Sequence, residues 1–253
     1  MTPESITPTS PEPQGMGEFS RLVGVYLEPT KAFTDIARRP TWLVPLVLVI
    51  LSGIAFFAIF GQHVGWARYL QHQLETNPKA AERMAQLPPE QRARTEEMQI
   101  KFAPVGADAV VAIFIPIALV VSAGVVLLVV NAMGAGLRYK QIFSIMAYGS
   151  LPIIVKYALA VVVMFLKNPD DFNPTNPLAF NAAAFMDPVT ASKFLYSIAT
   201  AVDLFAVWSL LLGATGLKAA AGKRLTFGGA LFAVATPYVF FALAGATLAG
   251  LFA

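Results

Sequence analysis

Residues 198–212 read IATAVDLFAVWSLLL, an apolar run that contains a single charged residue, Asp203. The run lies within residues 195–217, which are long enough to cross a bilayer core about 30 Å thick at about 1.5 Å per helical residue. A charged side chain near the middle of such a span costs at least about 2.5 kcal/mol unless it is neutralised. We therefore expect a neighbouring span to provide a partner for Asp203.

The composition of the whole chain is that of an integral membrane protein. Of its 253 residues, 57% are hydrophobic and 13% are charged, whereas soluble domains carry about 25% charged residues. Apolar segments of spanning length occur at residues 42–60, 109–133, 142–166, 195–217 and 230–252. The sequence therefore predicts an all-α membrane protein in which residues 41–253 form a bundle of five transmembrane helices.

Two segments precede the first span. Residues 1–16 are rich in proline and lack the basic and apolar regions of a signal peptide, so we expect a disordered tail. Residues 17–40 have helically spaced apolar residues on both sides of Pro29, which predicts two short amphipathic helices. The apolar positions are Phe19, Leu22, Val23 and Tyr26 before the proline, and Ala32, Phe33, Ile36 and Ala37 after it.

Two alternatives place these amphipathic helices. In the first, their apolar faces enter the headgroup region, where basic side chains such as Arg21 and Lys31 meet anionic lipid. In the second, the helices pack on the cytoplasmic end of the bundle itself. The residues that we expect at the interface or in partner binding are Phe19, Leu22, Tyr26, Pro29, Phe33, Arg38, Arg39 and Trp42.

The connections between the spans differ in length and charge. Residues 61–108 form a polar insertion with six basic and six acidic residues, and we expect it to be helical and outside the membrane. Residues 167–188 are rich in asparagine and proline and predict a solvated loop. The short connections GAGLRYKQ (134–141) and KAAAGKR (218–224) are basic. The positive-inside rule then places the N-terminus in the cytoplasm and the C-terminus outside.

Lys156 is the residue that can neutralise Asp203. It lies eleven residues before Lys167, and Asp203 lies ten residues after Lys193. Because consecutive spans run antiparallel, both charges are expected about 15 Å below the outer boundary. We predict an ion pair, which either specifies helix packing or forms a proton or ion relay. If the pairing is direct, combining Lys156→Asp with Asp203→Lys is expected to recover the folding that each single change loses.

A stripe of small residues runs along the last span. Ala242, Ala246 and Gly250 recur at intervals of four, which is typical of a helix-packing face and offers one route to a homo-oligomer. Enzyme signatures such as HExxH, GxSxG and the P-loop do not occur in the sequence. The chain has no cysteine, and His63 and His72 lack the spacing of a metal site. We therefore expect no enzymatic activity, cofactor, metal or nucleic-acid partner.

Three stretches, in order, resemble the Yip family, the Ypt/Rab-interacting membrane proteins with a Yip-one domain. They are EPTKAFTDIARRPTWLVPLVLVI (28–50), AYGSLPIIV (147–155) and VDLFAVWSLLLGATGL (202–217). The resemblance covers about residues 17–250 and implies a bacterial-type member with five spans, a cytoplasmic N-terminus and a place in the inner membrane. The residues that it marks, with structural or partner-binding roles, are Glu28, Pro29, Phe33, Pro40, Trp42, Pro45, Tyr148, Pro152, Asp203 and Trp208.

The resemblance also bears on partners and function. Eukaryotic relatives engage prenylated Rab-type GTPases, but their DLYGP-like stretch is absent here, where the nearest region reads GVYLEPTKAF (24–33). This difference argues against GTPase binding. The first functional hypothesis is a non-enzymatic membrane protein that scaffolds partner membrane proteins or shapes lipid through residues 17–40. The alternative is a small transporter or channel subunit that uses Lys156 and Asp203.

Overall fold

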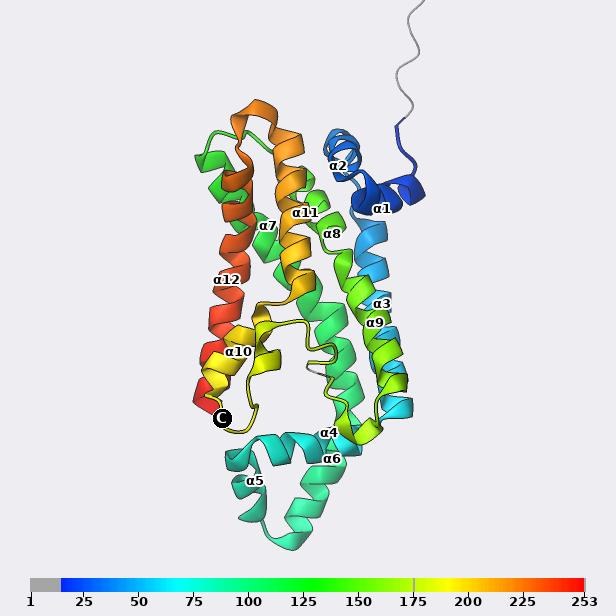
Figure 1. Ribbon diagram of the computed structural model, residues 1–253, viewed down its shortest axis with the longest axis vertical. Helices are drawn as coiled ribbons and strands as arrows, with labels where there is room; N and C mark the ends of the chain where they lie inside the picture. The colour runs from blue at the N-terminus through cyan, green and yellow to red at the C-terminus, as the bar shows by residue number, and fades with distance from the viewer. Residues whose placement is uncertain (1–14, 175, 253) are drawn as a thin grey trace, which may run out of the picture.

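The computed structural model describes residues 15–174 and 176–252. The predicted disordered tail, residues 1–16, lies outside the described residues except for Gly15 and Met16. Over the described ranges the named elements are helices, and five helical stretches are long and apolar enough to cross a membrane: Leu43–His63, Pro89–Ala132, Tyr139–Leu166, Leu204–Arg224 and Phe227–Leu251. The fold is therefore an all-α membrane bundle, as the apolar segments predict (Figure 1).

The helices have the following bounds. The first six are α1 (Glu18–Leu27), α2 (Pro29–Arg38), α3 (Leu43–His63), α4 (Trp66–Thr76), α5 (Pro78–Ala85) and α6 (Pro89–Ala109). A π-helical turn at Val110–Phe114 leads into α7 (Ile115–Ala132), which is followed by α8 (Tyr139–Gly149) and α9 (Pro152–Leu166). The last three are α10 (Lys193–Ala201), α11 (Leu204–Ala221) and α12 (Phe227–Phe252). Short 3-10 turns occupy Pro169–Asp171, Ala182–Phe185 and Gly222–Arg224.

The fourth span is broken where the sequence predicts one continuous helix over residues 195–217, so that prediction is wrong. α10 ends at Ala201 and α11 begins at Leu204. The predicted solvated loop, residues 167–188, is also wrong in part, because its chain folds back to the break. There Ala182 N–H donates to Val202 O at 3.2 Å, and Leu204 N–H donates to Phe180 O at 2.9 Å. These bonds satisfy backbone groups that a broken span would leave unpaired in lipid.

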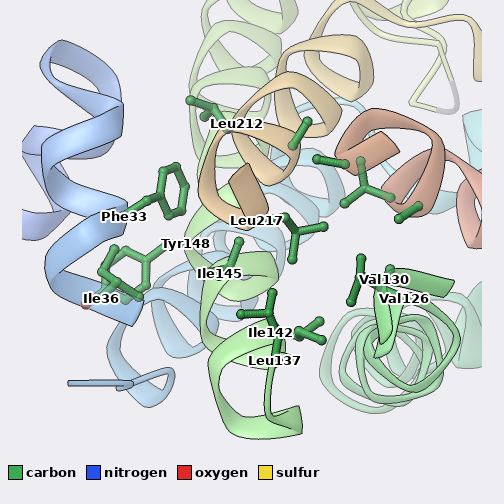
Figure 2. Close-up of a cluster of buried hydrophobic side chains, with 14 of the residues drawn as sticks. Phe33, Ile36, Val126, Val130, Leu137, Ile142, Ile145, Tyr148, Leu212 and Leu217 are labelled. Carbon is green, nitrogen blue, oxygen red and sulfur yellow. The ribbon is translucent and has the colours of Figure 1, made fainter. Parts of the chain in front are cut away.

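The N-terminal helices lie across one end of the bundle, beside the start of α3 (Figure 1). The apolar face of α2 is inside the protein, since Phe33 and Ile36 are 0% exposed. Figure 2 shows these two side chains directed towards Ile145 and Tyr148 of α8 and the residues of α11. Of the two alternatives for this helix, the structure therefore shows packing on the bundle, and Phe33 is not free to meet lipid or a partner.

Close helix approach at two glycines allows this packing. A Cβ added at Gly216 of α11 would overlap Ile145 Cγ2 and lie 2.8 Å from Phe33 Cδ1, so α2, α8 and α11 meet where a side chain is absent. A Cβ at Gly149 would lie 3.3 Å from the backbone nitrogen of Gly213, so α8 and α11 also touch through their backbones. α11 is consequently the helix around which α2 and α8 are packed.

The insertion predicted at residues 61–108 is a set of three helices, α4 to α6, at the end of the molecule opposite α1 and α2 (Figure 1). Asn77 caps α5 by accepting the Ala80 N–H at 3.2 Å, and Pro78 follows at the first helical position. α6 continues through the π-helical turn into α7, which makes Pro89–Ala132 one helical stretch of 44 residues. The insertion is therefore joined to the second span by continuous helix.

The small-residue stripe of the last span is covered in part by α10. Ala246 is 0% exposed, and a Cβ added at Gly250 would lie 3.4 Å from Phe194 Cβ of α10. Gly250 itself is exposed, and Ala242 is half-buried. The homo-oligomer through the last span stays a prediction.

Candidate functional site

The structure brings Lys156 and Asp203 together. Lys156 Nζ lies 3.1 Å from Asp203 Oδ2, and it donates a hydrogen bond to that oxygen. Asp203 is 5% exposed, whereas the side chain of Lys156 is 30% exposed. The pair joins the third span to the break in the fourth span, and its carboxylate is the buried member.

Asp203 also caps the helix that follows it. Its Oδ1 accepts the N–H groups of Phe205 at 2.9 Å and Ala206 at 3.1 Å, so it is the N-cap of α11. Asp is among the preferred N-cap residues because its carboxylate satisfies N–H groups that have no partner inside the helix. The negative charge also meets the positive end of the helix dipole. The carboxylate is thus held by a lysine and by a helix terminus at the same time.

Tyr238 places the break at the middle of the last span. It is the twelfth of the 26 residues of α12, and its hydroxyl donates a hydrogen bond to Ala201 O, the last residue of α10. The break, with Asp203, therefore lies level with the midpoint of a helix that is long enough to cross the membrane. The short α10, of nine residues, and the longer α11, of eighteen, meet at this break, and interrupted helices of this kind occur at transporter binding sites.

A central cavity of about 630 Å³ adjoins the break. All five spans contribute to its wall, which includes Leu46 of α3, Leu119 of α7, Lys156 of α9, Asp203 before α11 and Phe241 of α12. Most lining residues are apolar, and the charged ones are Lys156 and Asp203. A mostly apolar cavity with a few polar groups is the usual form of a small-molecule site.

A second polar cluster fixes α1 and α2 to the bundle. Arg21 is 3% exposed, and its Nε lies 2.8 Å from Asp35 Oδ2, while its Nη1 donates to Thr41 Oγ1 at 2.8 Å and lies 3.4 Å from Glu18 Oε1. Tyr148 of α8 donates its hydroxyl hydrogen to Glu18. We call Glu18, Arg21, Asp35, Thr41 and Tyr148 the Arg21 cluster, and it links both N-terminal helices to the third span.

Hydrogen bonds shift the acid–base equilibrium of Asp35 in this cluster. Burial alone would raise the pKa of its carboxyl group, but side-chain hydrogen bonds from Arg39 and Arg21, together with the Met16 N–H, hold that pKa below its usual value. Arg39 Nη2 is 2.6 Å from Asp35 Oδ1. Arg39, predicted at an interface, therefore also serves the fold through its pairing with Asp35.

Three other predicted residues have structural contacts. Tyr26 donates its hydroxyl hydrogen to Leu151 O at 2.8 Å, and its ring packs edge-on against Trp208 at 5.6 Å between centroids. Burial raises the pKa of Tyr26 to about 12, so its hydroxyl keeps the proton that it donates. Pro152 is buried at the first position of α9. The three residues lie where α1, α9 and α11 converge.

The remaining predicted residues lie at or near the surface of the α1–α2 end. Phe19 is 78% exposed and Trp42 is 36% exposed, with its ring edge-on against Phe143. Arg38 is exposed and Leu22 is half-buried. Pro29 begins α2. The predicted interfacial set is therefore divided between exposed and packed side chains.

Sequence reasoning missed the break, Tyr238 and Ser209. The signal for the break was Asp203 itself, because aspartate begins helices far more readily than it continues them. Tyr238 follows Pro237 in the last span, and its polar hydroxyl within that apolar run was the available signal. Ser209 lines the cavity, and its Oγ is buried with no hydrogen-bond partner among the described residues. Serine is common in membrane helices, so nothing in the sequence distinguished it.

These features define an integral, multi-pass membrane protein with five apolar spans and two helices packed across one end. Within that class the family is also determined. The family model of the Yip1 domain matches residues 23–249, so the chain belongs to the Yip1 domain family. No curated protein and no solved structure matches the chain in the corresponding comparisons.

Proposed function

We propose that the protein is a non-enzymatic membrane organiser that gathers anionic lipid and partner membrane proteins at the surface formed by α1 and α2. The observation that carries the proposal is that the Arg21 cluster holds α1 on the bundle while an apolar stripe of α1 faces outward. Arg21, on the inner side of α1, is buried in the Arg21 cluster, whereas Phe19, Val23 and Leu27 on the same helix are 78%, 39% and 75% exposed.

The spacing of this stripe suits a membrane interface. Phe19, Val23 and Leu27 recur every four residues, so they lie on one face of α1. A helix that lies in the membrane plane buries such a face about 5–10 Å into the boundary between headgroups and acyl chains. α1 lies across the spans at the level where α3 begins, which is the orientation that this insertion requires (Figure 1).

The charge at this end supports anionic lipid as one partner. Residues 17–41, 134–141 and 218–226 together hold nine basic and three acidic side chains, whereas residues 61–108 hold six of each. Basic residues beside a membrane attract anionic headgroups and favour the cytoplasmic side. We therefore propose that α1 and α2 face the cytoplasm of a bacterial inner membrane and that the C-terminus lies outside. A GTPase is not part of the proposal.

Spin labelling tests the lipid contact. The chain has no cysteine, so Val23→Cys and Thr30→Cys each create a single attachment site for a nitroxide. In nanodiscs that contain phosphatidylglycerol, the label at position 23 is expected below the headgroups and the label on the exposed Thr30 position in water. Equal exposure of both labels to a water-soluble relaxant would contradict the insertion of α1.

Crosslinking in native membranes tests the scaffolding. Replacing Phe19 and Leu27 together by glutamate is expected to abolish the crosslinks of α1 to membrane-protein partners while leaving the fold intact, because both side chains are exposed. Ser20→Glu is the matched control, since it adds charge at an exposed position of the same helix. Crosslinks that survive the double change would show that the stripe does not recruit partners.

A small transporter is the second candidate, and the broken fourth span with Lys156, Asp203 and the central cavity favours it. Flux of protons or ions through proteoliposomes would be lost with Asp203→Asn, which keeps the N-cap but removes the charge. Asp170→Asn is the control, because Asp170 pairs with Arg68 at the exposed far end. The absence of flux in the unaltered protein across cation and proton gradients would exclude ion transport.

A further inference from the structure

Two polar groups of the central cavity have unused hydrogen-bond donors. The Lys156 ammonium carries three N–H donors, and one of them bonds to Asp203. Ser209 Oγ is buried and unpartnered among the described residues. A ligand that brings oxygen atoms can accept hydrogen bonds from these donors.

The Asp203 carboxylate and Ala201 O already accept hydrogen bonds from the protein. Asp203 Oδ1 accepts the N–H groups of Phe205 and Ala206, and Oδ2 accepts from Lys156. Ala201 O accepts from Tyr238. The buried carboxylate, which an amine would bind, is thus already engaged by a lysine and a helix terminus, and this favours a ligand that brings acceptors.

The charge and depth of the cavity limit the ligand further. Lys156 and Asp203 neutralise each other, so the N-terminus of α11 adds only a partial positive charge. A doubly charged phosphate would be too costly to bury in a wall of this polarity. Because the break lies level with the middle of α12, the ligand also needs an apolar body that can reach this depth.

We propose that the central cavity binds a single-chain amphiphile whose acyl oxygen accepts hydrogen bonds from Lys156 and Ser209, with its alkyl chain along the apolar wall. A free fatty acid and an acyl ester share this chemistry. The volume of about 630 Å³ falls in the range of cavities that enclose small molecules. This inference is independent of the proposed function, because it concerns binding and not scaffolding or flux.

Photolabelling of the full chain in nanodiscs tests the site. The probe is palmitic acid that carries a diazirine on its chain, and the labelled residues are identified by mass spectrometry. Label is expected on cavity-lining residues such as Leu119 and Val234, of which Val234 is 4% exposed. Label confined to lipid-facing residues such as Phe240, which is 66% exposed, would overturn the proposal.

Filling the cavity separates binding from contact with bulk lipid. Ala118→Phe places a ring in the cavity wall on α7, whereas Val120→Phe places it on the same helix at a position that is 48% exposed. Labelling is expected to fall at least about tenfold in the first variant and to remain unchanged in the second. Ala242→Phe fills the cavity from α12 if Ala118→Phe does not fold. Equal labelling in the filled and control variants would overturn the site.

The hydroxyl and the competitors test the chemistry of the ligand. Ser209→Ala is expected to weaken labelling about fivefold, the effect of one lost hydrogen bond. Thr215→Ala on the same helix is the control, because that hydroxyl is bonded to Leu211 O. Competition by palmitate assigns a free fatty acid, and equal competition by methyl palmitate assigns an acyl ester. Equal competition by hexadecane, or no effect of Ser209→Ala, would overturn recognition of an acyl oxygen.

The outcome of these experiments is distinct from that of the proposed function. Failure of photolabelling leaves the depth of α1 and the crosslinks at Phe19 and Leu27 unaffected, because the described residues of the cavity wall include none of α1. Failure of α1 insertion likewise leaves the labelling of Leu119 and Val234 unaffected. The two proposals can therefore be rejected separately.

Discussion

The two buried polar groupings of this protein use the same chemistry in different surroundings. In the Arg21 cluster, a guanidinium that is 3% exposed meets two carboxylates and a threonine hydroxyl beneath packed helices. In the central pair, Asp203 is 5% exposed but the Lys156 side chain is 30% exposed beside a cavity. Neighbouring helices enclose the first grouping, whereas the second borders the central cavity and has unused hydrogen-bond donors.

This difference distinguishes a structural contact, the Arg21 cluster, from a candidate binding site, the central pair. The Arg21 cluster ties α1, α2 and α8 together, and its loss acts on the fold. The central pair also caps α11, but its unused donors lie where a ligand has room. Burial of charge by itself therefore does not mark a functional centre, and the volume next to the charge is what distinguishes the two groupings.

The largest effect is expected from Arg21→Met. The change leaves Asp35 and Glu18 without their buried partner, and breaking such a pair costs about 3–5 kcal/mol. Arg38→Met is the control, because Arg38 is exposed. Unfolding in detergent and proteolysis of α1 measure the result. If both variants lose equal stability, the Arg21 cluster does not hold α1 and α2 on the bundle.

Asp203→Ala is expected to cost about 3 kcal/mol, since it removes the N-cap of α11 and leaves Lys156 without its partner. Asp203→Asn is expected to cost less, because asparagine is also a good N-cap. Circular dichroism during thermal unfolding compares the two. The charge swap suggested by the sequence is not expected to restore the fold, because a lysine at position 203 cannot accept the N–H groups of α11. Full recovery in the swapped variant would show that the cap is unimportant.

Gly216→Ala tests the close approach of α2 and α8 to α11. The added methyl group would overlap Ile145 and Phe33, and overpacking of this kind costs about 1–3 kcal/mol. Gly228→Ala is a matched control, because a Cβ at Gly228 would have no neighbour within 4 Å. Stability in detergent and the protease resistance of α2 report the effect. A neutral Gly216→Ala would mean that α2 can shift without loss.

The smallest effect is expected from acid. The pKa of Asp35 is lower in the folded protein than in the unfolded chain, so its ionic contacts stabilise the fold above the ordinary aspartate pKa, about 3.9. This contribution is lost as the pH falls below that value. Hydrogen exchange of α1 and α2 between pH 5 and pH 3 should show the loss in the unaltered protein. An identical pH dependence in Asp35→Asn would assign it to another group.

The sequence predicted the elements whose patterns are strong. Apolar length identified the five spanning stretches, and three short stretches in order identified the family. The partner of Asp203 followed from depth counting, because few ionisable residues lie inside the spans. The division of span four did not follow, since Asp203 was assigned to the middle of a helix and not to the start of one.

Packing between distant segments could not be predicted from local patterns. The apolar face of α2 suits lipid and protein equally, and Gly216 on α11 is what admits Phe33 to the interior. The cavity could not be predicted either, because its wall draws on all five spans. Such features depend on the relative positions of helices, which cannot be read from the residue periodicity of a single helix.

The π-helical turn at Val110–Phe114 changes the angular phase of the long helix that joins α6 to α7. One extra residue in a turn of 3.6 rotates everything beyond it by about 100°. The direction of the side of α6 that carries Met98 and Phe102, relative to the side of α7 that borders the cavity, therefore depends on this turn. Deleting a single residue there would restore regular α-helical winding and rotate the insertion, α4 to α6, around the axis of the long helix. One local irregularity thus determines the orientation of three helices.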